Sequence, residues 1–426
     1  MYIDDSNFYL LVYSLLWFSY LFIYKRINGR FTLGYVLIAL YAILSVLTII
    51  VFNSDYAIQY YENKVTLFPL LYLFGMISIT SLPITTLREN KIKYITIPGE
   101  PYNTYFCVFF GFFSALAVLL MLPQLQEGFN ILLLDSDTIT DLYYEKTEER
   151  MAHRTLSSGF SIIGVISNLS GLLGPLLFYT YLLQKRRNKY VLILVSITII
   201  QGVFIGISTA SRAKIVSSVF SVTLLYFFFK PYLEDNIKKI LKKVFLFGSV
   251  IIVLLLSVIT IARMESNNKT MSTYVVRYLG GGTLVFDNYC MSANGTREGY
   301  YTAPLFVRLL GKESLTEEER RVKFQHLKID NSRFYTYVGD YVLDYGPYVA
   351  FVIFVLIAVF GGLGLRYNNG LSYGQIVILY MLFIFCSAYY QAALTGTGGN
   401  IAFLFELSLS FIYYSKRDGV VRIYRK

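Results

Sequence analysis

Apolar residues occur along this chain in blocks of about twenty, the length that an α-helix needs to cross about 30 Å of hydrocarbon. The period-2 alternation of a membrane β-barrel is absent from the sequence, and only helices and closed barrels span lipid. The pattern therefore predicts an all-α, polytopic integral membrane protein with a single membrane domain over residues 1–426. We expect about eleven transmembrane helices, at 8–24, 33–52, 67–87, 102–122, 156–183, 190–208, 213–229, 245–262, 345–365, 374–394 and 401–414.

The composition agrees with this pattern and explains the charge. Of the 426 residues, 55% are hydrophobic, 17% aromatic and only 15% charged, whereas soluble proteins carry about 25% charged residues. The net charge of +11 comes from short basic stretches: KRINGR, RENKIK, QKRRNK, KPYLEDNIKKILKK and the C-terminal SKRDGVVRIYRK. All of them lie on one side if the N-terminus is outside and the C-terminus cytoplasmic, as the positive-inside rule requires. The surplus charge follows from topology, so we expect no nucleic-acid partner.

The N-terminal sequence, the cysteines and one acidic tripeptide further limit the class of protein. The acidic start MYIDDSN lacks the basic region of a cleavable signal, so we expect the first span to remain as an anchor. Two of the three cysteines lie within expected spans, which excludes a disulfide framework. The tripeptide DSD at 135–137 is similar to the Asp-x-Asp that holds a metal in nucleotide-sugar transferases. This loop is rich in acidic residues, so chance explains the tripeptide better than a metal site does. We therefore expect neither a metal nor a cofactor.

In this topology two external segments are long, at 123–155 and 263–344. Within the second, TAPLFVRLLG (302–311) predicts a helix lying on the membrane, and SLTEEERRVKFQHLK (314–328) predicts another because it holds two overlapping capping boxes. The apolar stretch at 278–291 is too short to cross and fits a re-entrant or interfacial piece. We therefore expect a partly helical external cap.

Arginines are the first candidate functional residues. Arg212 lies in ISTASRAKI, between two spans with almost no loop. It either snorkels to lipid headgroups or binds a phosphate, since a guanidinium pairs well with phosphate oxygens. The second external segment adds five more, which together would form a site for a doubly charged phosphate: Arg263, Arg277, Arg297, Arg308 and Arg333. Those that flank expected membrane boundaries, Arg263, Arg277 and Arg333, are the preferred members.

Carboxylates and tyrosines are the second group. Asp340 and Asp344 share a helix face at the start of the ninth span. They either favour the helix N-terminus through its dipole or supply a general base for a sugar hydroxyl. Glu406, inside the last span, is either a neutral bonded acid or part of proton-coupled transport. Outer tyrosines, including Tyr335 and Tyr337, belong to an interface belt or stack on sugar rings.

Three motifs occur in a fixed order along the chain and resemble those of a known family. They are ISTASRAKI between two closely spaced spans, the element RYLGGGTLVFDNY, and TYVGDYVLDYGPY before the ninth span. Their layout resembles the bacterial oligosaccharide repeat-unit polymerases, the Wzy-type O-antigen and capsule polymerases of lipopolysaccharide and polysaccharide biosynthesis. The resemblance implies a metal-independent, C-type glycosyltransferase (GT-C) fold in the bacterial inner membrane. Such an enzyme transfers the growing glycan from undecaprenyl pyrophosphate to a new lipid-linked unit at the outer face.

Carried to this chain, the resemblance implies roles for particular residues. Arg212 and Arg277 would hold and stabilise the pyrophosphate, and Asp340 or Asp344 would act as the base. Asp287, in RYLGGG…FDNY, would bind substrate. The implied partners are the undecaprenyl-pyrophosphate-linked oligosaccharide, membrane lipid and a chain-length regulator.

Two other functions stay open at this stage. An O-antigen ligase would share the donor and the outer-face arginines and differ in its acceptor. A non-enzymatic flippase or exporter would place charges at the middle of the spans, where only Glu406 clearly qualifies. The sequence leaves open the sugars, their linkage, the base, the oligomeric state and the control of chain length.

Overall fold

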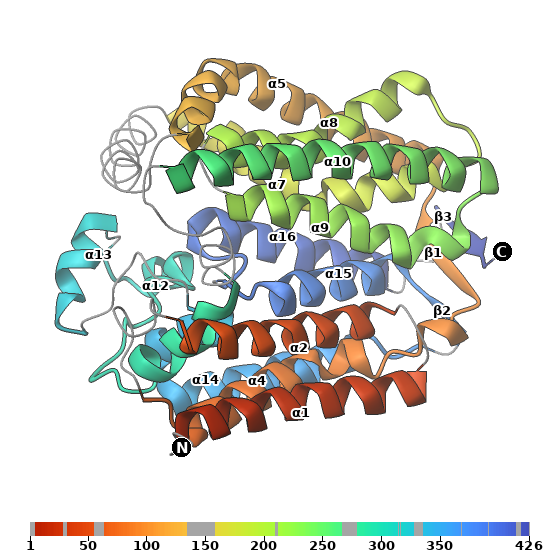
Figure 1. The fold of residues 1–426 in the computed structure, drawn as a ribbon. Helices are drawn as coiled ribbons and strands as arrows, with labels where there is room; N and C mark the ends of the chain where they lie inside the picture. The colour runs from red at the N-terminus through yellow and green to blue at the C-terminus, as the bar shows by residue number, and fades with distance from the viewer. Residues whose placement is uncertain are drawn as a thin grey trace. The chain divides into compact units, whose positions relative to one another are not determined.

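A computed structural model of the 426-residue chain describes residues 5–28, 32–54, 64–133, 158–208, 212–265, 279–313, 315, 317–327, 335–367, 369–390, 392–414 and 419–425. These residues are mostly helical (Figure 1). Seven helices in the described ranges are long and apolar enough to cross a membrane, as expected of an all-α membrane protein. Each of the eleven expected spans overlaps a helix, but the tenth, expected at 374–394, is helical only to Ser387. The number of true crossings stays a prediction.

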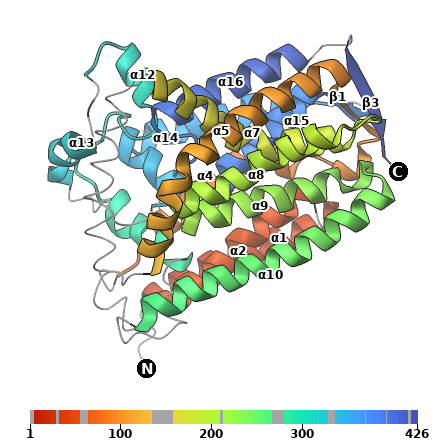
Figure 2. The same cartoon turned by 90° about the horizontal axis from the view of Figure 1, so that it is seen from above.

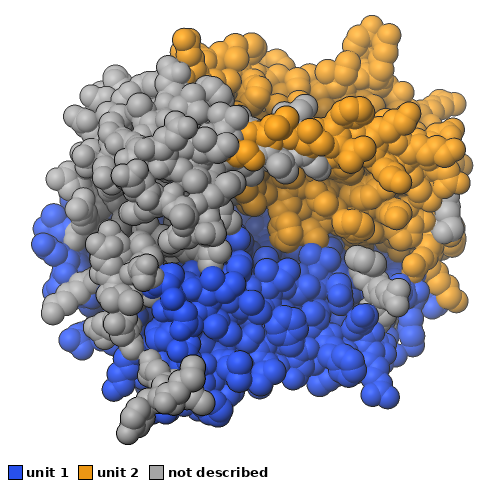
Figure 3. Space-filling model, viewed as in Figure 1, with its two compact units in different colours: residues 1–92, 272–415 blue, residues 93–271, 416–426 orange. Residues whose placement is uncertain are grey.

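The described chain divides into two compact units, each described below by itself (Figure 3). Unit 1 comprises Met1–Ile92 and Ser272–Ser415, and unit 2 comprises Lys93–Met271 and Lys416–Lys426. Each unit therefore combines stretches that lie far apart in the sequence. The expectation of a single membrane domain stays a prediction.

Unit 1 is built on long helices from both ends of the chain. They are α1 (Asp5–Asn28), α2 (Leu33–Phe52), α4 (Leu67–Thr85), α14 (Tyr337–Gly364), α15 (Tyr373–Ser387) and α16 (Gly396–Tyr414). Its shorter elements are η1 (Glu89–Lys91), the π-helical η3 (Phe286–Cys290), α12 (Pro304–Leu309), α13 (Glu317–Lys323), η4 (Gln325–Leu327) and β2 (Gly370–Leu371). Helices α1, α2 and α4 lie side by side, and α15 packs along α16 (Figures 1 and 2).

The core of unit 1 is aromatic where these helices meet. Trp17 of α1 is 1% exposed and stacks on Tyr41 of α2, with ring centroids 5.0 Å apart. It also meets Phe74 of α4 edge-on at 4.8 Å. Such ring pairs contribute about 0.5–1.5 kcal/mol beyond the area they bury. They add to the hydrogen bonds that also join these helices, such as those of Ser45 with Ser14 and of Tyr20 with Thr85.

The described part of unit 2 contains five long helices and a small antiparallel strand pair. The helices are α5 (Glu100–Leu133), α7 (Ser158–Leu182), α8 (Lys189–Ser208), α9 (Arg212–Phe229) and α10 (Asp235–Glu265), with the short η2 (Lys230–Tyr232) between the last two. Strand β1 (Tyr94–Pro98) pairs with β3 (Val420–Tyr424) near the C-terminus. Helix α5 continues to Leu133, past the expected start of the external loop at residue 123. The rest of that loop lies outside the described residues.

The second external segment contains ordered helices. Both expected helices are present, as α12 and α13. The apolar stretch before them forms a helix over 279–285 that continues into η3. Val307, Phe324 and Leu327 pack with Tyr300 into a small apolar cluster of their own. The described part of this external segment is therefore folded, with helices and an apolar cluster of its own.

Candidate functional site

The ninth expected span begins earlier in the structure than its hydropathy indicates. Helix α14 starts at Tyr337 because Thr336 caps it, with its hydroxyl accepting the Gly339 N–H at 3.1 Å. This extra helical length contains both Asp340 and Asp344, which lie one turn apart on the same face. Their side chains are 1% and 0% exposed. Two buried carboxylates at this spacing require a shared positive partner.

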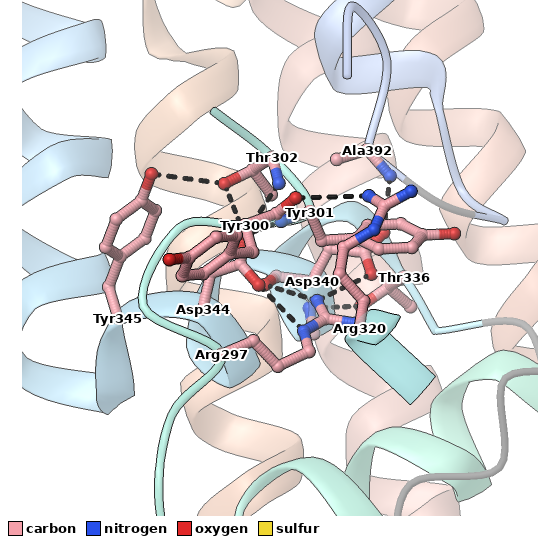
Figure 4. A network of polar contacts seen from close by, with 11 residues as sticks. Arg297, Tyr300, Tyr301, Thr302, Arg320, Thr336, Asp340, Asp344, Tyr345 and Ala392 are labelled. Atoms are coloured by element: carbon pink, nitrogen blue, oxygen red, sulfur yellow. Dashed lines mark hydrogen bonds and ion pairs between the residues drawn. The ribbon is translucent and has the colours of Figure 1, made fainter. Parts of the chain in front are cut away.

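That partner is Arg297, which approaches from the loop before α12 (Figure 4). Its Nε donates to Asp344 Oδ1 at 2.7 Å, and its Nη2 donates to Asp340 Oδ1 at 3.2 Å. The Arg297 side chain is itself buried, and its guanidinium lies 4.6 Å from the ring centre of Tyr301. We call Arg297, Asp340 and Asp344 the ion triad.

A break in α14 explains why Arg297 also binds the helix backbone. Gly346 has φ 80° and ψ 162°, a conformation that essentially only glycine adopts, and Pro347 follows it. Proline has no N–H, so the carbonyl of Leu343 loses the donor it would have in an unbroken helix. The backbone N–H of Arg297 donates to that carbonyl at 2.7 Å. The DYGPY sequence thus creates the acceptor that fixes the loop between η3 and α12, residues 291–303, which we call the arginine loop.

The two carboxylates have different surroundings. Asp344 accepts four hydrogen bonds: one from Arg297, and three at Oδ2 from the Thr302 N–H (2.6 Å), the Thr302 hydroxyl (2.7 Å) and the Tyr301 N–H (3.3 Å). The Asp340 side chain accepts two, from Arg297 and from the Ala392 N–H at 2.7 Å. A carboxylate offers about four lone-pair sites. Asp344 is therefore saturated, whereas Asp340 can still accept a hydrogen bond.

Asn400, near the start of α16, connects the same segments. Its amide donates to the carbonyls of Thr302 (2.9 Å) and Leu394 (3.1 Å), and its oxygen accepts from the Leu305 N–H at 3.2 Å. Leu394, in the connection between α15 and α16, and Gly396, the first residue of α16, both have positive φ, 60° and 73°. The arginine loop, the start of α14 and the α15–α16 turn therefore meet at one place.

The two neighbouring carboxylates keep the guanidinium of Arg297 charged. Burial lowers the pKa of Arg297, but the carboxylates of Asp344 and Asp340 raise it by more, so its pKa lies above the ordinary value. These bonds hold three segments in fixed geometry, and they leave Asp340, buried at 1% exposure, as the carboxylate that can still accept a hydrogen bond.

Asp287 has a separate structural partner. It lies in η3 and accepts from the N–H (3.1 Å) and the hydroxyl (2.8 Å) of Thr66, the residue before α4. It is 6% exposed. In this conformation Asp287 joins η3 to the start of α4, and substrate binding by this residue stays a prediction.

The two proposed sugar-stacking tyrosines are buried. The Tyr337 hydroxyl bonds to the hydroxyl of Thr80 at 2.5 Å, and its ring packs edge-on against Phe354 and Phe385 at 5.9 and 5.0 Å. Tyr335 is 5% exposed and Tyr337 0%. This packing favours a core role, and their stacking on a sugar stays a prediction.

Of the arginines expected to bind phosphate, Arg297 instead pairs with the two aspartates, and Arg308 is exposed in α12. The side chains of the other four lie outside the described residues. Arg212 begins α9 and Arg263 lies in α10, but their side chains are outside the described residues. Arg277 and Arg333 fall wholly outside the described ranges, as does the acidic DSD at 135–137. In the part of the chain that the structure describes, no group of three or more His, Cys, Asp and Glu residues could hold a metal.

The sequence predicted that Asp340 and Asp344 lie on one helix face, but it did not distinguish Arg297 from the other outer arginines. Thr302, the Ala392 N–H and Asn400 were missed. One signal was available: Pro347 leaves a carbonyl on α14 without its usual donor, and two acids on one buried face need a cation. Which cation supplies it cannot be read from spacing, because Arg297 is 43 and 47 residues from its partners.

Comparisons of this chain with protein-family models, with curated proteins and with solved structures found no match.

Proposed function

We propose that this chain is an oligosaccharide repeat-unit polymerase of the bacterial inner membrane, with a C-type glycosyltransferase fold of about eleven spans. It would transfer the growing glycan from undecaprenyl pyrophosphate to a new lipid-linked unit at the outer face. One observation carries the proposal. Five charged residues are buried among those described, Asp287, Arg297, Asp340, Asp344 and Glu406. All but Glu406 lie in the predicted external segment or in the first two turns of α14, as suits chemistry at a membrane surface.

The triad would serve this reaction by positioning. Its bonds hold the arginine loop and the α15–α16 turn against the start of a membrane helix, and fixed geometry of this kind lowers the entropy cost of bringing two substrates together. Asp340, with acceptor capacity to spare, is the proposed base for the acceptor hydroxyl. Asp344 is assigned to positioning. Arg212 and Arg277, helped by Arg263 and Arg333, would stabilise the departing pyrophosphate.

The direct test supplies the purified protein with lipid-linked repeat units and no nucleotide sugar. We expect a ladder of longer lipid-linked glycans on a gel. Arg212→Ala and Arg277→Ala should each lower the rate of chain extension at least about a hundredfold, the usual loss on removing one transition-state donor. Arg366→Ala is the matched control, because Arg366 is exposed and lies on the predicted cytoplasmic side. A normal ladder from both arginine variants would contradict the pyrophosphate assignment.

A deletion strain separates polymerase from ligase. Loss of the polymerase should leave single repeat units on the lipid core. If instead long glycans persist on the undecaprenyl carrier and never reach the core, the protein is a ligase and the proposed acceptor is wrong.

One observation favours transport as a second candidate function. Glu406 of α16 is 0% exposed, and neither carboxylate oxygen has a hydrogen-bond partner among the described atoms. Unpaired acids inside membrane spans often belong to proton pathways. If the protein is an exporter, Glu406→Gln should abolish movement of lipid-linked sugar across proteoliposomes. If it is a polymerase, the same isosteric variant should leave the glycan ladder unchanged.

A further inference from the structure

The first three turns of α10 carry an exposed group of lysines. Lys239, Lys242 and Lys243 are exposed, and none of them makes an ion pair with another described residue. Lys238 differs, because it pairs with Asp235 at 2.9 Å. Figure 2 shows α10 as a long continuous helix in unit 2.

This arrangement is unfavourable for the helix by itself. Lys239 and Lys243 are four residues apart and Lys239 and Lys242 three, so each pair brings like charges onto neighbouring positions. An external anion between the lysines would relieve this repulsion.

Exposed apolar side chains stand beside the lysines on the same helix. Ile240, Val244 and Phe247 are 60%, 57% and 68% exposed and recur at helical spacing, so they form one ridge. The buried Ile237 and Leu241 border this ridge on the side away from the lysines. An apolar ridge bordered by lysines matches the boundary between acyl chains and headgroups.

We propose that the start of α10 is a binding site for acidic phospholipids. The ammonium groups of Lys239, Lys242 and Lys243 contact phosphate oxygens of the headgroups, and the ridge of Ile240, Val244 and Phe247 lies against the upper acyl chains. In the predicted topology this is the cytoplasmic leaflet, where juxtamembrane lysines meet a negative surface. The site is independent of the glycan chemistry proposed above.

The test measures binding of phosphatidylglycerol to the detergent-solubilised full-length protein by native mass spectrometry. We expect the triple variant K239Q/K242Q/K243Q to bind it about a hundredfold more weakly, at roughly fivefold per lysine. Raised salt should weaken binding to the wild type and have less effect on the variant. Phosphatidylcholine should bind both proteins equally weakly.

A second triple variant controls for net charge. K185Q/R186Q/K189Q removes the same charge from exposed positions on the same predicted side, so it should keep nearly full affinity for phosphatidylglycerol. The substituted lysines of α10 are exposed, so both variants should elute as the wild type does on gel filtration. Equal losses in the two variants would show that charge alone attracts the lipid, and undiminished binding by the α10 variant would also overturn the proposal. Tighter binding of inorganic phosphate than of phosphatidylglycerol would exclude a lipid site.

Discussion

Replacing Arg297 with methionine is expected to lower the free energy of unfolding by about 3–5 kcal/mol, since it leaves two buried carboxylates with no counter-charge. The loss exceeds that of one ion pair, because the Nη2 of Arg297 also donates to the main-chain carbonyl of Asp340 at 3.0 Å. The backbone N–H of residue 297 remains to bind Leu343, so the loop should stay near α14. Unfolding in detergent micelles, followed by heat or denaturant, measures the effect.

Two further variants separate charge from shape. Arg297→Lys keeps the charge but cannot reach both carboxylates with a planar fork, so its stability should lie between those of the wild type and Arg297→Met. Arg308→Met is the control, because Arg308 is exposed in the same segment and its loss should change stability by no more than about 0.5 kcal/mol. If Arg297→Met is as stable as Arg308→Met, the ion triad does not hold the arginine loop in the way described.

The second large effect is expected at Asp344. In Asp344→Asn the side-chain NH₂ must face either the Nε–H of Arg297 or the N–H of Thr302, because both carboxylate oxygens accept from donors. The arginine also loses its shorter ionic contact. We expect unfolding free energy to fall by about 3–5 kcal/mol, and little folded protein in the membrane fraction. Gel filtration of the solubilised variant measures this loss.

Asp340→Asn is the matched comparison for that variant. Asp344 still neutralises Arg297, and the new amide meets one unfavourable donor, the Ala392 N–H. The expected loss of stability is about 1–3 kcal/mol, so the protein should fold. If Asp340 is the base, this folded variant should not extend lipid-linked glycan. Equal stability losses in the two variants would remove the distinction between a saturated Asp344 and an available Asp340, and normal chain extension by Asp340→Asn would remove the base.

The membrane class and the helices could be predicted from the sequence because they depend on local properties. Twenty apolar residues in a row require a hydrogen-bonded helix in lipid wherever they occur. The helices at α12 and α13 were predicted for the same reason, from caps and stripes within a dozen residues. The start of α14 was placed too late, because hydropathy does not detect a polar first turn that Thr336 caps and that tertiary contacts bury.

The sequence by itself thus determined that the chain is a helical membrane protein, and it drew attention to Asp340 and Asp344 through their spacing on one face. Only the tertiary structure decided what those acids bind. Arg297 comes from a loop 43 to 47 residues away, and the Ala392 N–H from a turn 52 residues beyond Asp340. Helix periodicity relates residues within a few turns, whereas contacts between distant segments depend on how the whole unit packs. The same packing brings the Arg297 N–H to the Leu343 carbonyl that Pro347 leaves without a helical donor, and this bond fixes the arginine loop on α14.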